Sequence, residues 1–298
     1  MYLSIDIGGT SIKSGIIKES DIVEIVDKQE FPTNAKKVHG TGIEKKIVEI
    51  IESYKKNYDI DGVAISTAGV VNSSTFEIAY ANENIPFYTG INLADTVKKE
   101  FNLPCIVEND VNCAAVGELH YGSGKGYSNI FCLTVGTGIG GSIIIDKHLY
   151  HGASFTAGEI GYMKINKKDF QDIASTSFLV NRVKEITGLE LNGKEIFEQA
   201  LKGHVPIQQI IDTFCENLVE GIVTIFYLLN PEKIIIGGGI MEQTEYLYPI
   251  INNKIQKAMD GVLKKNIDVS FAKLGNNAGM YGAYHLLKRY LADEKSTF

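Results

Sequence analysis

A strand, a glycine-rich turn and a second strand occur twice in this sequence, and this repeat constrains the fold more than any other feature. The first copy covers residues 3–17, with Gly8-Gly9-Thr10 at its turn. The second copy covers residues 130–146, and its turn is predicted at 136–141. The strands are rich in apolar residues, as expected for strands that lie in a buried sheet. The recurrence predicts a fold built twice from one design.

Hydrophobic periodicity around the repeat predicts further strands and helices. Residues 43–56, for example, carry apolar side chains at helical spacing. The other expected elements are strands at 22–28, 62–66, 105–107 and 233–236 and helices at 92–101, 206–229 and 279–293. This mixture indicates an α/β fold. We place an N-terminal α/β domain at residues 1–117 plus about 281–298, and a C-terminal α/β domain at 118–280.

Composition narrows the classes of protein to which the chain can belong. The 298 residues suffice for two domains, and an apolar fraction of 44% is typical of globular proteins. The net charge of −7 argues against a nucleic-acid partner, because phosphate binding needs clustered Lys and Arg. The apolar runs are shorter than the ~20 residues that cross a bilayer, and no signal peptide is visible. We therefore expect a cytoplasmic protein with no membrane partner.

The four cysteines are scattered along the chain, and no two stand at C-x-x-C spacing. This spacing suggests neither a zinc site nor a disulfide framework. We expect reduced core residues at all four positions: Cys105, Cys113, Cys132 and Cys215.

The first glycine turn has the composition of a phosphate-binding loop. In D-I-G-G-T-S-I-K at residues 6–13, the adjacent glycines let backbone N–H groups approach an anion. Thr10 adds a hydroxyl donor, Lys13 adds positive charge, and Asp6 suits a Mg²⁺ ion held through water. An ordinary β-hairpin with a Gly-Gly turn explains these residues equally well.

The second turn, T-V-G-T-G-I-G-G at residues 134–141, has four glycines in eight residues. Since glycine weakens a strand by about 0.5–1 kcal/mol per position, a backbone cradle for phosphate explains them better than packing does. The segment lacks the G-K-[ST] end of a Walker A loop, and a strand follows it where a Rossmann site needs a helix. Gly237-Gly238-Gly239 offers a flat surface for adenine or ribose, or forms a simple strand-to-helix turn.

The segment E-N-D-V-N at residues 108–112 follows a predicted strand and surrounds Asp110 with polar side chains. Phosphoryl transfer needs a group that accepts the proton of the attacking hydroxyl, and a strand-end Asp can do this. Asn109 both donates and accepts, which suits the neighbouring hydroxyls of a sugar. The alternative is a helix N-cap formed by Asn112 or Asp110, and Asp110 can serve as cap and base together.

Together with A-G-E-I-G-Y at residues 157–162, these segments resemble the ROK family of sugar kinases and repressors, within the actin-like ATPase superfamily. The five motifs stand in order over nearly the whole chain. The resemblance implies the duplicated actin-like ATPase (ribonuclease H-like) α/β fold, with two domains and a cleft between them. It also implies a homodimer or homotetramer.

The resemblance further implies a role for each motif. Asp110 would be the general base on the sugar hydroxyl that receives the phosphoryl group, expected to be the 6-hydroxyl. The sugar would be bound by Asn84, Asn109, Glu159, Tyr162 and Gly69. ATP, accompanied by Mg²⁺, would be bound by Asp6, Gly8, Gly9, Thr10, Lys13, Gly136, Thr137, Gly138, Gly238 and Gly239.

Two departures from the family pattern bear on metal and substrate. Zinc-containing members have His where this chain has Tyr162, and residues 163–185 contain no Cys or His, so we expect no structural zinc. Gln171 falls where a sugar-binding Glu is usual. Tyr162 followed by Met163 resembles the zinc-less branch that includes β-glucoside kinases, and an aromatic ring there can stack on a second sugar ring or an aglycone.

We therefore expect a hexose or β-glucoside as substrate, with N-acetylmannosamine kinase and glucokinase as alternatives. A non-enzymatic transcriptional repressor of the same family would need a helix-turn-helix ahead of the first strand, which begins at residue 3, and Asp110 also speaks for an enzyme. A chaperone or filament ATPase would not need the segments at 108–112 and 157–161.

Overall fold

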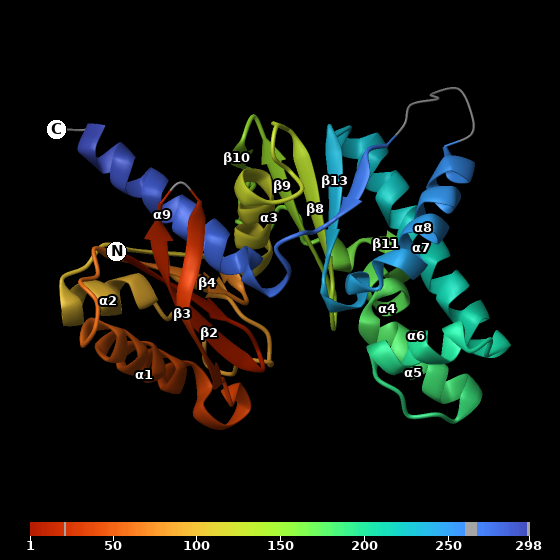
Figure 1. Ribbon diagram of the computed structural model, residues 1–298, viewed down its shortest axis with the longest axis horizontal. Coiled ribbons are helices and arrows are strands. Elements are labelled where there is room, and N and C mark those ends of the chain that lie inside the picture. The colour runs from red at the N-terminus through yellow and green to blue at the C-terminus, as the bar shows by residue number, and fades with distance from the viewer. Residues whose placement is uncertain (21, 260–266, 297–298) are drawn as a thin grey trace. The chain divides into compact units, whose positions relative to one another are not determined.

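The computed structural model describes residues 1–20, 22–259 and 267–296 of the chain, without the side chains of 294–296 (Figure 1). The chain divides into two compact units. Unit 1 consists of Met1–Tyr121, His151–Ala157 and Asn276–Phe298, and unit 2 of Gly122–Tyr150 and Gly158–Gly275. Among the described residues, no helix combines the length and apolarity that crossing a membrane requires.

Unit 1 is built on a five-stranded sheet with the strand order β3-β2-β1-β4-β7. Its strands are β1 (Tyr2–Ile7), β2 (Ser11–Glu19), β3 (Val23–Pro32), β4 (Gly62–Thr67) and β7 (Cys105–Asn109). β1, β4 and β7 run parallel, whereas β2 and β3 join them in antiparallel pairing. A separate two-stranded ribbon pairs β5 (Val70–Val71) with β6 (Ile78–Tyr80).

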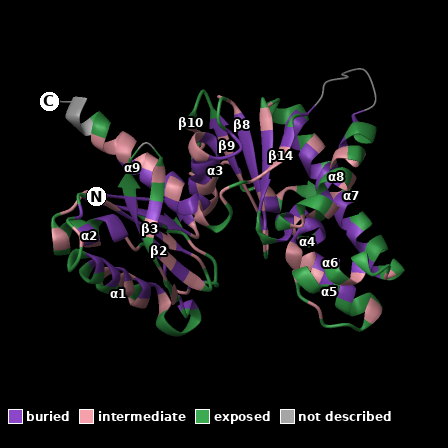
Figure 2. Ribbon diagram, viewed as in Figure 1, coloured by how far each residue is buried: buried purple, intermediate pink, exposed green. Residues whose placement is uncertain are grey.

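Helices cover both faces of the unit 1 sheet (Figure 1). They are α1 (Ala35–Lys55), α2 (Leu93–Phe101), α3 (Asp110–Tyr121) and α9 (Ala278–Ser296). On one face, α1 and α2 share a buried cluster with strand residues such as Leu3 and Ile65. On the other face, Ala64 and Ile106 pack with Cys113 of α3 and Leu287 of α9. Helices thus cover both faces, and β4 is buried along its whole length, whereas the edge strand β3 is mostly exposed or half-buried (Figure 2).

Unit 2 contains a second five-stranded sheet, with the order β10-β9-β8-β13-β14. Its strands are β8 (Ile130–Val135), β9 (Ile139–Ile145), β10 (His148–Leu149), β13 (Lys233–Gly237) and β14 (Val269–Phe271). Its helices are α4 (Phe170–Ala174), α5 (Thr176–Thr187), α6 (Gly193–Leu201), α7 (Val205–Leu229) and α8 (Thr244–Ala258). These helices and the strands β8 and β13 enclose one large apolar core.

Short elements complete unit 2, and the last of them continues into unit 1. They are the hairpin β11 (Lys164–Ile165) and β12 (Lys168–Asp169) and the 3₁₀ turns η1 (Ile160–Tyr162), η2 (Gly239–Glu242) and η3 (Gly275–Asn277). The sequence patterns did not predict these elements.

The two sheets have the same topology, which confirms the predicted duplication. In each, an antiparallel hairpin lies beside three parallel strands, so that β1, β2, β3, β4 and β7 correspond to β8, β9, β10, β13 and β14. The third strand of the second copy is only two residues long. The predicted α/β fold with one design used twice is therefore correct.

The turn of the second copy is shorter than predicted. We expected a turn over residues 136–141, but β9 begins at Ile139. Gly141 is a strand residue, and a Cβ atom there would lie 2.5 Å from the Phe131 ring and 2.7 Å from the Gly158 carbonyl oxygen. This glycine therefore permits close packing on β9, and packing was the explanation that we had judged weaker.

Helix α7 shows how well a long periodic pattern locates an element. The prediction of 206–229 lies within one residue of the observed bounds. The His204 ring accepts a hydrogen bond from the Ile207 N–H over 3.4 Å, and Pro206 occupies the first turn, where its missing N–H costs nothing. Asn230, in the left-handed conformation, ends the helix.

Candidate active site

The parallel strands of unit 1 bring the first and fourth motifs to one edge of the sheet. Across β1, β4 and β7, the residues Asp6, Ser66 and Glu108 stand in register. The next row consists of Ile7, Thr67 and Asn109. Because parallel strands end at the same edge, the turn after β1 and the junction of β7 with α3 lie at the same edge of the unit 1 sheet.

Asp6 is a half-buried carboxylate at this edge. Its Oδ1 accepts a hydrogen bond from the Ser66 hydroxyl over 2.6 Å. Burial raises the pKa of the Asp6 carboxyl, while the bond from Ser66 and the charge of Lys13 act in the opposite direction. Lys13 stands opposite Asp6 in the β1–β2 pairing. A cation close to Asp6 would further offset the cost of burying its negative charge.

The turn after β1 is held by Thr33, the residue that follows β3. The Thr33 hydroxyl donates to the Gly8 carbonyl over 2.7 Å, and the Thr33 N–H donates to the Thr10 carbonyl over 2.9 Å. Gly9 and Thr10 remain exposed. The backbone of this turn is therefore fixed from one side and open on the other.

Asn109 caps helix α3 and contacts Asp110. Its Oδ1 accepts from the backbone N–H groups of Val111 and Asn112 over 2.9 and 3.0 Å. Its Nδ2 donates to the Gly69 carbonyl over 2.9 Å and to Asp110 Oδ1 over 3.1 Å. These four bonds use the two acceptor and two donor positions of the amide. Asn109 therefore positions its neighbours within the protein.

Helix α3 therefore has the N-cap that the sequence suggested as an alternative, but the capping residue is Asn109. We expected Asn112 or Asp110 to cap the helix, but the side chain of Asn112 donates to Glu108 Oε1 over 3.0 Å. Asp110 Oδ1 accepts from the Val111 N–H over 2.9 Å, next to the cap formed by Asn109. Since helix α3 begins at Asp110, the residue before it is the one in place to cap.

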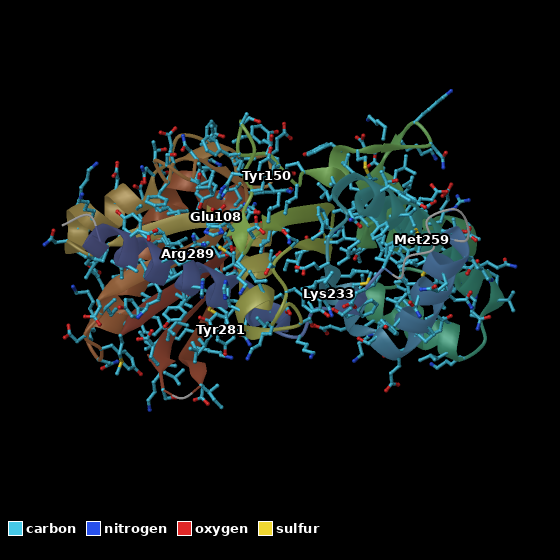
Figure 3. All side chains as sticks on the ribbon, turned by 90° about the horizontal axis from the view of Figure 1, so that it is seen from above. Glu108, Tyr150, Lys233, Met259, Tyr281 and Arg289 are labelled. Carbon is cyan, nitrogen blue, oxygen red and sulfur yellow. The ribbon has the colours of Figure 1, made fainter. Side chains whose placement is uncertain are left out.

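Glu108, which is labelled in Figure 3, is a buried carboxylate of β7. Its Oε1 accepts from the Asn109 N–H over 2.8 Å as well as from Asn112. Its Oε2 lies 2.8 Å from Nε2 of His151. The hydrogen bond with Glu108 raises the pKa of the His151 imidazole and outweighs the opposing effect of burial. Our sequence reasoning missed His151, because nothing in its local sequence marks it.

Gly69 and Asn84, the other residues of unit 1 that we predicted to bind sugar, lie in different surroundings. Gly69 follows β4 with φ 105°, a conformation that favours glycine, and its carbonyl receives the Asn109 bond. Asn84 is exposed in the segment after β6, where its N–H donates to Asn82 Oδ1 over 3.0 Å. Gly69 therefore acts through its backbone, and the Asn84 side chain is accessible.

In unit 2, the second and third glycine motifs also meet at one sheet edge. β8 and β13 are parallel neighbours, with Gly237 opposite Thr134. The turn Gly136–Gly138 follows β8, and Gly238-Gly239 follows β13. The Gly136 carbonyl accepts from the Thr176 N–H at the start of α5 over 2.9 Å, while Thr137 is exposed.

Three glycines in these motifs are not required by the fold: Gly9, Gly136 and Gly239. A Cβ atom added to any of them would meet nothing within 4 Å, and none has a φ in the left-handed region. By contrast, Gly238 has φ 107°, and a Cβ atom there would lie 2.1 Å from the Val135 carbonyl oxygen. The open backbone at the three positions provides the space that a phosphate or nucleoside needs beside its N–H groups.

The segment with Glu159 is held against β9 by its two glycines. Cβ atoms on Gly158 and Gly161 would lie 2.4 and 2.3 Å from the carbonyl oxygens of Gly141 and Ile139. Glu159 itself is exposed, although the protein packed beneath it raises the pKa of its carboxyl by desolvation. This segment therefore presents a carboxyl group from a tightly packed backbone.

Tyr162 and Gln171 lie beside this segment. Tyr162 is 55% exposed, which leaves much of its ring accessible. A Cβ atom on Gly138 would lie 2.8 Å from Gln171 Oε1, and one on Gly161 would lie 3.1 Å from it. The Gln171 side chain therefore lies between the turn after β8 and the Glu159 segment.

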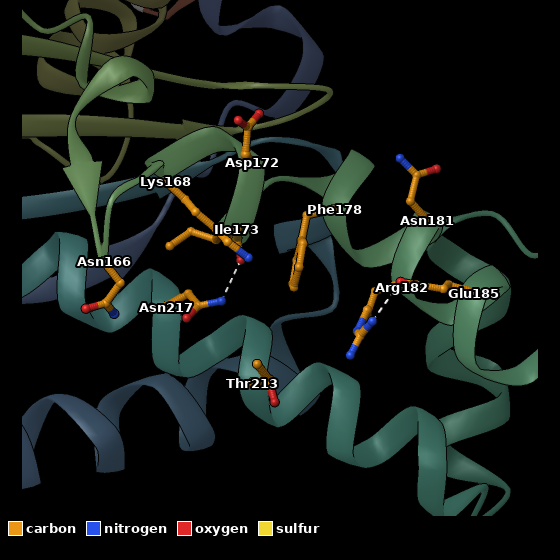
Figure 4. A pocket seen from close by; sticks show the side chains of 10 residues that line it. All are labelled: Asn166, Lys168, Asp172, Ile173, Phe178, Asn181, Arg182, Glu185, Thr213 and Asn217. Atoms are coloured by element: carbon orange, nitrogen blue, oxygen red, sulfur yellow. Dashed lines mark hydrogen bonds and ion pairs between the residues drawn. The ribbon is translucent and has the colours of Figure 1, made fainter.

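A separate cavity of about 610 Å³ opens in unit 2 among β12, α4, α5 and α7 (Figure 4). Asn217 donates to the Ile173 carbonyl at its wall over 2.7 Å, and Arg182 pairs with Glu185 over 2.7 Å. None of the predicted site residues lines it. No group of three or more His, Cys, Asp or Glu suited to a metal ion occurs in the part of the chain that the structure describes.

The model of the ROK family matches residues 2–290. The chain belongs to the ROK family. A curated relative from Clostridium perfringens, described as uncharacterized, is 44% identical over 97% of this chain and 98% of its own length. A β-glucoside kinase from Listeria innocua is 30% identical over 95% of this chain and 96% of its own length.

Solved structures of the family have the same fold. A ROK family protein from Streptococcus pneumoniae in complex with sucrose superposes with a TM-score of 0.84, at 28% identity, over 99% of each chain. A glucokinase from Streptomyces griseus in complex with glucose and AMPPNP gives 0.83, at 26% identity, over 97% of this chain and 99% of the other. The predicted actin-like ATPase fold is thereby confirmed.

Proposed function

We propose that this ROK-family sugar kinase transfers the γ-phosphoryl group of ATP to a hydroxyl of a hexose or β-glucoside, with Asp110 as the general base. The observation that carries the proposal is the placement of Asp110. It stands at the first position of α3, after a parallel strand, and its carboxylate accepts bonds from Asn109 and Val111. A fixed carboxylate of this kind meets the requirement for a general base.

The acceptor hydroxyl gives its proton to the Asp110 carboxylate while its oxygen forms a bond to the γ-phosphorus. The bond between that phosphorus and the bridging oxygen breaks, and ADP leaves. Asn109 orients Asp110, and Glu159 and Asn84 bind sugar hydroxyls as acceptor and donor. The expected acceptor is the 6-hydroxyl.

The open glycines support the assignment of ATP. In each of the three motifs, the backbone is free of a side chain at a position where the fold would accept one: Gly9, Gly136 and Gly239. We assign the turns with Gly9 and Gly136 to the phosphates and Gly239 to the adenosine. Thr10, Lys13 and Thr137 would add hydroxyl donors and positive charge to the phosphate turns, and the AMPPNP complex of the Streptomyces griseus glucokinase agrees with this nucleotide.

Asp6 fits the Mg²⁺ ion that accompanies the nucleotide. It is a half-buried carboxylate beside the phosphate turn, desolvation raises its pKa, and a nearby divalent cation would favour its charged form. When bound, Mg²⁺ would neutralise charge on the transferring phosphates. We propose that Asp6 holds it through water.

Tyr162 favours a substrate with a group attached at C1 of the glucose ring. Its exposed ring follows Glu159 by three residues and offers an apolar face for a second sugar ring or an aglycone. The relative from Listeria innocua that is named a β-glucoside kinase supports the same substrate class. Glucokinase is the second candidate, supported by the Streptomyces griseus enzyme.

A coupled assay of ADP release tests the proposal. Cellobiose, a simple aryl β-glucoside, glucose and N-acetylmannosamine are each supplied with ATP and Mg²⁺. We expect turnover with glucose-based substrates and the highest kcat/KM for a β-glucoside. Highest kcat/KM for glucose would favour the second candidate, and no turnover with any sugar would refute the kinase assignment.

A further inference from the structure

A network of hydrogen bonds links His151 to Asp110. The His151 imidazole contacts Glu108 Oε2 over 2.8 Å, and Glu108 Oε1 accepts from the Asn109 N–H over 2.8 Å. Asn109 Nδ2 then donates to Asp110 Oδ1 over 3.1 Å. This network lies within unit 1, and its bond between His151 and Glu108 joins residues 43 positions apart in sequence.

We propose that His151 is a positioning residue for the general base Asp110, acting through Glu108 and Asn109. The inference rests on the proposed function, because it assigns a role in the same reaction. The His151 ring bonds to Glu108 and not to the base, so its effect would be on the orientation of residues 108–110, where β7 passes into α3.

Burial explains why Glu108 needs a partner. The Glu108 side chain is 7% exposed, and removing the partner of a buried charge leaves a large desolvation cost. Without the imidazole, that cost would favour rotation of the Glu108 carboxyl away from its present position. Such a rotation would weaken the bonds that Oε1 accepts from Asn109 and Asn112.

The protein also fixes the imidazole in place. His151 is 23% exposed and begins a short loop, His151–Ala157, that belongs to unit 1. The Ala157 N–H donates back to the His151 carbonyl over 3.1 Å, and Gly152 between them has φ 71°. This closure holds the ring at Glu108 before the chain continues to Glu159.

The test compares His151→Phe, which keeps a flat ring but removes the donor, with His151→Gln, which keeps an N–H donor. His148→Phe is the matched control, because His148 is exposed on β10 and its ring bonds to the carbonyl of Asp146, away from Glu108. Kinetic constants for ATP and sugar are measured for each, together with the melting temperature.

We expect His151→Phe to lower kcat by about 10–100-fold with little change in the KM for ATP, since misplacement by ~1 Å can cost that much. His151→Gln should restore most of kcat, and His148→Phe should behave as the wild type. A lower melting temperature with unchanged kcat would overturn the inference and leave a purely structural role. Equal loss in His151→Gln and His151→Phe would overturn it as well.

A double-mutant cycle gives an independent readout. If His151 acts through Glu108, combining His151→Phe with Glu108→Gln should reduce kcat no further than the worse single variant. Multiplicative losses would show separate roles and contradict the inference. Absence of turnover in the wild-type enzyme would instead refute the proposed function, and the positioning role with it, so the two failures are distinguishable.

Discussion

The Asn109 side-chain amide donates to Asp110 Oδ1 over 3.1 Å while its own oxygen caps helix α3. One side chain thus links the start of a helix to the proposed general base. The polar positions of Asn109 are used within the protein, so its expected direct bonding to sugar hydroxyls would require it to give up one of these bonds. This geometry favours a role for Asn109 in positioning Asp110 over direct binding of the sugar.

Asn109→Asp tests this role. Aspartate is a good N-cap, so the melting temperature should fall only slightly. The new carboxylate cannot donate to the Gly69 carbonyl or to Asp110, and its charge opposes that of the base. We expect kcat to fall by about 10–100-fold. Steady-state kinetics and thermal melting check both parts, and a large rise in the KM for sugar at unchanged kcat would indicate direct sugar binding instead.

Gly136→Ala and Gly239→Ala should separate stability from nucleotide binding. Because the fold has space and a permissive φ at both positions, alanine should leave stability unchanged or raise it by about 0.4–1 kcal/mol. A methyl group against the nucleotide should raise the KM for ATP about tenfold or more, or ~1.4 kcal/mol.

Gly238→Ala is the matched control for these variants, because its Cβ atom would meet the Val135 carbonyl and its φ is 107°. It should lower the melting temperature. Normal ATP kinetics in both Gly136→Ala and Gly239→Ala would contradict the nucleotide assignment.

Tyr162→Ala tests the proposed second-ring contact. Loss of the exposed ring should reduce kcat/KM for cellobiose or an aryl β-glucoside about tenfold, while glucose is affected much less. Parallel assays on the two substrates give the ratio, with Tyr162→Phe expected to retain it. Equal losses on both substrates would reject a stacking role.

The ion pair of His151 and Glu108 should make stability depend on pH. Since the folded-state pKa of His151 is raised, the stabilisation is complete below its unfolded value of 6.5 and is lost as pH rises through the folded value. Chemical denaturation of the wild type and His151→Gln should therefore show the largest difference in unfolding free energy near pH 6. A difference that grows toward pH 9 would contradict the assigned pair.

Much of the fold follows from local sequence patterns. The two strand–turn–strand segments predicted the duplication, and the apolar periodicity located α7 to within one residue. The turn at 136–141 was overestimated because Gly140 and Gly141 read as turn residues. Gly141 instead lies in β9 against the Phe131 ring and the Gly158 backbone, and the local sequence does not show these contacts.

Within the candidate site, the common position of Asp6 and Asp110 at the ends of strands could be predicted from the sequence. Asp6 and Asp110 each end or follow a strand, and the sheet then aligns those strands. His151 was not predictable, since its link to Glu108 depends on a loop that the chain places in unit 1 between two segments of unit 2. The sequence likewise does not show that the Asn109 amide donates to the Gly69 carbonyl, because the two residues are 40 positions apart.

The central claim, that Asp110 is the base of a sugar kinase, is tested most directly by the turnover of Asp110→Asn. Asparagine preserves the shape of the side chain but cannot accept the hydroxyl proton. With the best substrate from the sugar screen, kcat should fall about 10²–10⁴-fold while the dissociation constant for sugar changes little. Turnover close to that of the wild type would contradict the account.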